Sequence, residues 1–73
     1  MTRTFSVLLN ELGEACVEVQ ALIYKLELPN LSPNQKAYIL ADLLAAVINL
    51  QYHCKEDFQK LISDEMENLH DQE

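Results

Sequence analysis

The sequence is poor in the residues that make tight turns. Its 73 residues include one glycine, Gly13, and two prolines, Pro29 and Pro33. A β-sheet of this size needs several tight turns, and glycine and proline are the residues that most often mark them. Hydrophobic residues make up 49% of the chain, which is too many for a disordered segment. We therefore expect one all-α domain spanning residues 1–73.

Cysteines, targeting signals and long apolar runs are also scarce. The two cysteines, Cys16 and Cys54, are too few for a disulfide framework or a zinc cluster, and we expect both to be small side chains in a helical core. The apolar residues near the start are too few for a secretory signal. No apolar run reaches the roughly 18 residues of a membrane span. These absences predict a cytoplasmic protein without a membrane contact, a metal or a cofactor.

Positive charge is sparse, which argues against nucleic-acid binding. Five basic residues are set against twelve acidic ones, and the net charge is −7. Residues 64–73 hold five of the acidic residues and none of the basic ones. Affinity for nucleic acid depends mainly on Lys and Arg neutralising phosphates. We expect residues 64–73 to form an acidic, frayed tail that is available to a basic protein surface.

Apolar residues spaced alternately by three and four predict two long helices. The first helix is expected over about residues 4–28 and the second over about 33–69, with a turn at 29–32. Ser32, Pro33 and Gln35 have the order of a helix N-cap, first residue and capping-box partner. A short connection favours antiparallel neighbours, so the pair is predicted to form a two-helix hairpin. The expected inward-facing residues are Phe5, Leu9, Leu12, Cys16, Val19, Ile23 and Leu26 in the first helix, and Ala37, Leu40, Leu44, Val47, Gln51, Cys54, Phe58 and Leu61 in the second.

The second helix carries more apolar residues than the first helix can cover. A second stripe consists of Ile39, Leu43, Ala46 and Leu50. A helix that is apolar on most sides is normally buried on most sides. We therefore predict that this stripe is an interface between two copies, which form a four-helix bundle as a homodimer. The alternative is a monomer in which the second helix bends near residues 51–55 and folds back as a third helix.

Two polar residues interrupt the apolar surface of the second helix. Asp42 and Asn49 are seven residues apart and therefore lie on one line of the helix. They either set the register of an oligomer, as single polar residues do in coiled coils, or face water.

Four acidic residues are the candidates for a metal site, although none is assigned as catalytic. Glu11, Glu14 and Glu18 share a helix, and Asp42 lies on the other helix. Carboxylates on facing helices hold Mg²⁺ in some helical bundles. Glu11, Glu14 and Asp42 resemble three of the four carboxylates in the E-x-x-E and E-x-x-D motifs of the MazG-type all-α nucleotide pyrophosphohydrolases. Ile39 stands where that family has its second glutamate, and this puts activity in doubt.

His53 and Asp57 form another possible pair, with a His and a carboxylate four residues apart on one helix beside Cys54. Two ligands do not make a metal site, and we expect a solvated pair.

The sequence therefore favours a small non-enzymatic interaction or regulatory module that self-associates through its second helix. The alternative is a Mg²⁺-dependent nucleotide pyrophosphohydrolase, active or degenerate, with Glu11, Glu14, Glu18 and Asp42 as metal ligands.

Overall fold

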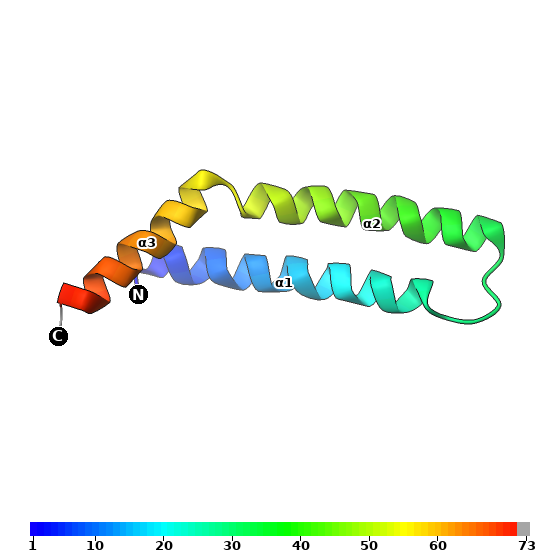
Figure 1. Ribbon diagram of the computed structural model, residues 1–73, viewed down its shortest axis with the longest axis horizontal. Coiled ribbons are helices and arrows are strands. Elements are labelled where there is room, and N and C mark those ends of the chain that lie inside the picture. Colours follow the sequence, from blue (N-terminus) through cyan, green and yellow to red (C-terminus); the bar gives the residue numbers. More distant parts are fainter. Residues whose placement is uncertain (72–73) are drawn as a thin grey trace.

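The computed structural model describes the backbone of residues 1–71 and the side chains of residues 1–69. Over this range the chain is all-helical and has no strand, as the sequence predicts. It forms three helices: α1 (Arg3–Leu26), α2 (Pro33–His53) and α3 (Glu56–Asp71). The molecule is elongated, with principal extents of 55 × 19 × 16 Å. This length arises partly from α3, which bends away from the line of α2 and extends beyond the start of α1 (Figure 1).

The connection between α1 and α2 is a tight turn. Glu27 and Leu28 donate backbone hydrogen bonds to the carbonyls of Tyr24 and Lys25, which closes the last turn of α1. Asn30 then adopts a φ of 67°, a left-handed conformation that asparagine tolerates better than most residues. The helix ends two residues earlier than the sequence predicted, because the residue before Pro29 is disfavoured in the helical region.

The start of α2 has the cap that the sequence predicts. The Ser32 hydroxyl accepts a hydrogen bond from the Gln35 N–H (3.1 Å), and the Gln35 side chain accepts one from the Ser32 N–H (2.8 Å). Pro33 is the first helical residue, where its missing N–H costs nothing. This reciprocal capping box satisfies two of the donors that a helix N-terminus leaves free.

α1 and α2 lie side by side and run in opposite directions (Figure 1). Ala15 lies 11 residues before the end of α1 and Ala46 lies 13 residues after the start of α2, which places them within about 3 Å of one level along the axis, and both are buried. The buried and half-buried residues of each helix recur every three or four positions, as in a coiled-coil pair. Apart from half-buried Leu9, which lies beside this line, they are Phe5, Leu8, Leu12, Ala15, Val19, Leu22 and Leu26 in α1, and Ile39, Leu43, Ala46, Leu50 and His53 in α2.

The inward face of α2 differs from the predicted one. Leu40, Leu44 and Val47 were expected to face α1, yet they are 52%, 63% and 44% exposed. The stripe that includes Ile39 and Ala46 faces α1 instead. The two stripes of α2 have the same spacing in the sequence, so the periodicity alone does not decide which of them packs against α1.

The predicted helix over residues 33–69 is interrupted at Cys54 and Lys55, and α2 and α3 meet at an angle of 47°. The interruption changes which residues face α1. A continued helix would carry the inner positions of α2 on to Asp57 and Lys60, whose charges would then be buried. The break instead turns Phe58 and Leu61 inward, and Phe58 is only 7% exposed.

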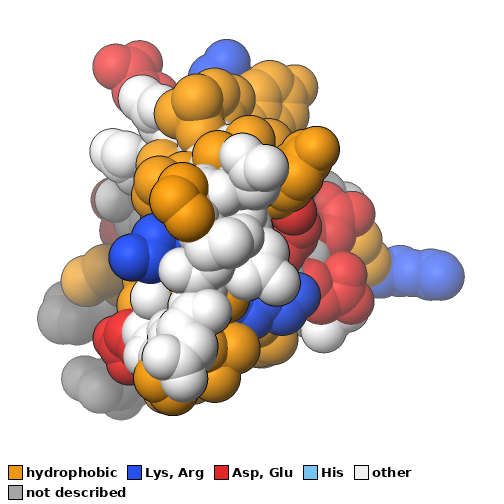
Figure 2. Space-filling model, turned by 90° about the vertical axis from the view of Figure 1, so that its right-hand side faces the viewer, with side chains coloured by type: hydrophobic (Ala, Val, Ile, Leu, Met, Phe, Trp, Pro, Cys, Tyr) orange, Lys and Arg blue, Asp and Glu red, His pale blue; other side chains and the backbone are white. Residues whose placement is uncertain are grey.

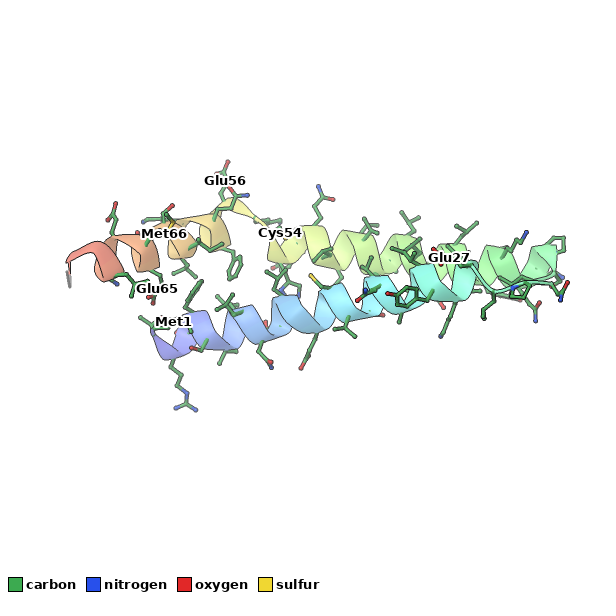
Figure 3. All side chains as sticks on the ribbon, turned by 60° about the horizontal axis from the view of Figure 1, so that its bottom comes forward. Met1, Glu27, Cys54, Glu56, Glu65 and Met66 are labelled. Atoms are coloured by element: carbon green, nitrogen blue, oxygen red, sulfur yellow. The ribbon has the colours of Figure 1, made fainter. Side chains whose placement is uncertain are left out.

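α3 packs on the first turn of α1. The rings of Phe5 and Phe58 stack with centroids 5.7 Å apart. The backbone N–H of Thr2 donates to a carboxylate oxygen of Glu65 at 3.0 Å, and Figure 3 shows Glu65 beside Met1 at this end. A carboxylate is favourable there because the N-terminus of a helix carries partial positive charge. The predicted frayed tail begins at residue 64, but α3 continues to Asp71; residues 72–73 lie outside the described part of the chain.

The aromatic stack predicts a large loss of stability for Phe58→Ala. Removing a buried phenylalanine costs roughly 3 kcal/mol or more, and Phe58 is the one buried side chain on the described part of α3. Urea unfolding followed by circular dichroism measures the change. The matched control is Tyr38→Ala, because Tyr38 is 75% exposed and its loss is expected to change the free energy of unfolding by about 0.5 kcal/mol or less. Equal effects of the two substitutions would contradict the packing of α3 on α1.

Candidate functional site

The four carboxylates that the sequence singles out do not form a cluster. Glu11, Glu14, Glu18 and Asp42 are all exposed. Glu14 accepts a weak hydrogen bond from the Asn10 side chain at 3.4 Å. No group of three or more His, Cys, Asp or Glu side chains lies within reach of a common metal ion in the residues that the structure describes. Within the described part of the chain, the four carboxylates are therefore not brought together around a common ion.

Both cysteines are free and exposed, whereas the sequence predicted them to be core residues. The difference follows from the inner positions that the helices use. Cys16 comes directly after buried Ala15, and Cys54 follows half-buried His53 as the C-cap residue of α2. Each cysteine is thus turned about 100° away from the contact line between α1 and α2. Figure 3 shows Cys54 at the bend between α2 and α3.

The predicted His53–Asp57 pair spans the break between α2 and α3. His53 and Asp57 are among the residues that line a shallow hollow of about 180 Å³ next to Phe58. Nearby, the Lys55 ammonium lies 4.5 Å from the centre of the Tyr52 ring, a cation–π contact at the surface.

The stripe predicted as the interface between copies is largely occupied within the chain. Ala46 is buried, and Ile39, Leu43 and Leu50 are half-buried on the side of α2 that contacts α1. An interface on α2 remains a prediction, but the residues available to it are the apolar ones that α1 leaves uncovered.

Apolar residues that are exposed or half-buried border the contact line on one side of the helix pair. The inner positions of each helix form two rows with a spacing of seven residues. The first rows are Leu8, Ala15 and Leu22 in α1 and Ile39, Ala46 and His53 in α2, and the second rows are Phe5, Leu12, Val19 and Leu26 in α1 and Leu43 and Leu50 in α2. In two antiparallel helices, the residues directly after the first rows lie on one side of the pair, and the residues directly before the second rows lie on the opposite side. On the first side this rule selects a set that we call the apolar flank: Leu9, Cys16 and Ile23 of α1 with Leu40 and Val47 of α2 and its C-cap residue Cys54.

The opposite side of the helix pair is polar. The same rule selects Glu11, Glu18 and Lys25 of α1 with Asp42 and Asn49 of α2, and every one of them is exposed. Asp42 and Asn49 therefore face water within the single chain. The two sides of the helix pair therefore differ in polarity. Sequence periodicity alone does not reveal this difference, because the two sides can be told apart only when the inward-facing residues of both helices are known.

Apolar side chains cover much of the molecular surface. In Figure 2 they form much of the upper surface, where α2 lies in Figure 1. Leu44 and Ile48 of α2 are 63% and 58% exposed. No described side chain has an exposed fraction below 2%. The buried core consists of Phe5, Ala15, Leu22, Ala46 and Phe58.

Comparison with known protein families, curated proteins and solved structures gave no match. Among the described residues, no single helix is long and apolar enough to cross a membrane; the bent pair of α2 and α3, taken together to Leu69, meets the criteria of length and composition. The site is therefore interpreted from the surface of this chain alone.

The scattered carboxylates predict that the protein does not bind Mg²⁺ or Mn²⁺ at a defined site. Calorimetric titration to millimolar metal is expected to give no saturable heat, because isolated, exposed carboxylates keep their hydration and do not share an ion. The variant Glu14→Gln is expected to behave like the parent protein. A saturable signal in the parent that disappears in Glu14→Gln would contradict this account and restore the hydrolase alternative.

Proposed function

We propose that the protein is a small non-enzymatic interaction module that acts as a homodimer, in which two α1–α2 hairpins associate into a four-helix bundle. Its self-association uses the apolar surface that α2 and the adjoining side of α1 leave exposed. The cytoplasm is the proposed location.

The observation that carries this proposal is the amount of surface that the chain leaves exposed. A compact monomer of 8.4 kDa exposes about 4,600 Å², whereas this chain exposes 6014 Å². The excess of about 1,400 Å² exceeds the roughly 800 Å² that each partner buries in a protein interface of standard size. Association with a second copy supplies the burial that a core of five side chains does not.

A hydrolase is the weaker hypothesis. Its proposed ligands Glu11, Glu14, Glu18 and Asp42 are exposed, and the described residues include no metal-binding group of three or more side chains. An interaction module needs only a surface, and the apolar surface is the most unusual feature of this chain.

The acidic C-terminal segment supports a second contact. Among the described side chains of α3, Asp64 and Glu67 are exposed, and Glu65 is engaged at the start of α1. We propose that this segment binds a basic surface through charge, with an affinity that falls as salt concentration rises.

The homodimer proposal predicts a melting temperature that depends on protein concentration. Unfolding of a dimer releases two chains, so dilution favours the unfolded state by mass action. For a dimer of this size the midpoint is expected to fall by about 4 °C for each tenfold dilution. Thermal unfolding followed by circular dichroism over two decades of concentration measures it. A midpoint that does not move with concentration would contradict the dimer.

A further inference from the structure

We propose that the apolar flank is the dimer interface, and that two copies stack on it with their α1–α2 connections at opposite ends. This inference rests on the proposed homodimer and specifies its contact surface and orientation. The interface consists of Leu9, Cys16, Ile23, Leu40, Val47 and Cys54 from each copy.

The position of the flank suits a four-helix bundle. In such bundles each helix packs one side against its hairpin neighbour and an adjoining side against the second layer. Leu40 and Val47 are 52% and 44% exposed and lie beside the inner line of α2, and Ile23, at 42%, has the matching place on α1. The polar side with Glu18 and Asp42 then remains in water.

The spacing within the flank fits a two-fold axis. Its residues recur every seven positions on both helices, and such a row presents one side chain about every 10 Å. Cys16 and Val47 are the middle members of their rows. Cys16 lies 10 residues before the end of α1 and Val47 lies 14 residues after the start of α2, so the two are within about 6 Å of one level along the axis. A two-fold axis at the level of Cys16 brings Cys16 against its own copy and Leu9 against the partner's Ile23, with Val47 about one turn of helix from the axis.

Charge favours connections at opposite ends. The helix α3 carries six acidic residues and one basic residue, so a dimer with both connections at one end would hold two acidic α3 segments together at the other end. The segment around the connection includes Lys25 and Lys36, against the single acidic residue Glu27. The opposite-end arrangement separates the two α3 segments and brings the start of each to the level of the partner's Lys25 and Lys36. Complementary charge of this kind selects the orientation of partners.

The two orientations pair the helices differently. With the connections at opposite ends, α1 lies against α1 of the second copy and Cys16 meets Cys16. With the connections at one end, α1 lies against α2 of the second copy, and Cys16 lies near the level of the partner's Leu43, about ten residues from the partner's Cys54. A disulfide requires the two Cα atoms to be within about 7 Å, so it reports which pairing exists.

The test begins with the full chain and two matched substitutions on α2. Light scattering first establishes whether the parent protein is a dimer; a monomer would overturn the proposed function together with this inference. With a dimeric parent, Leu40→Glu is expected to raise the dissociation constant at least a hundredfold, because it would bury an unpaired charge. Ile48→Glu is the control, since Ile48 is 58% exposed but lies outside the flank. A dimer that survives Leu40→Glu, or that is lost only in Ile48→Glu, would overturn the interface while leaving the homodimer intact.

The orientation is tested by oxidising the native dimer with diamide. A covalent dimer is expected in the parent and in Cys54→Ala, but not in Cys16→Ala. No covalent dimer in the parent, or one that depends on Cys54, would overturn the opposite-end arrangement. Neither cysteine is buried in the chain, so both substitutions are expected to fold. Far-ultraviolet circular dichroism of each variant checks this.

Discussion

The structure depends on one constraint: α2 carries apolar residues on most of its circumference, and α1 covers only one side of it. The covered side is the one that carries buried Ala46, and the facing side of α1 carries buried Ala15 and Leu22. Small side chains at a helix contact leave room for the larger residues beside them to pack. This choice of contact line determines which apolar residues of α2 are left outside.

The break between α2 and α3 is a consequence of the same contact line. The inner positions of α2 lead on to Asp57 and Lys60, and burying these charges without partners would cost several kcal/mol. The chain therefore interrupts its helix at Cys54 and Lys55 and resumes with Phe58 turned toward Phe5. Acidic residues Glu56 and Asp57 in the first turn of α3 favour a new helix start at that place.

Part of this account could be predicted from the sequence, and part could not. The helix content, the connection and the capping box of Ser32 and Gln35 follow from local rules that involve neighbouring residues. The choice between the two apolar stripes on α2 does not follow from local rules. Both stripes have the same period, and they differ only in how they fit against α1. Leu40 and Val47 were accordingly expected inside and lie outside. The candidate metal ligands failed to assemble for a related reason: Glu11, Glu18 and Asp42 border the contact line on its polar side, and all three remain in water.

The central claim is that the surface left outside is covered by a second copy. Light scattering on a sizing column, at several protein concentrations, tests it most directly. The account predicts a mass of twice the 8.4 kDa chain, maintained on dilution to low micromolar concentration. A mass equal to that of one chain at every concentration would contradict it and would show that the apolar flank stays uncovered in the isolated protein.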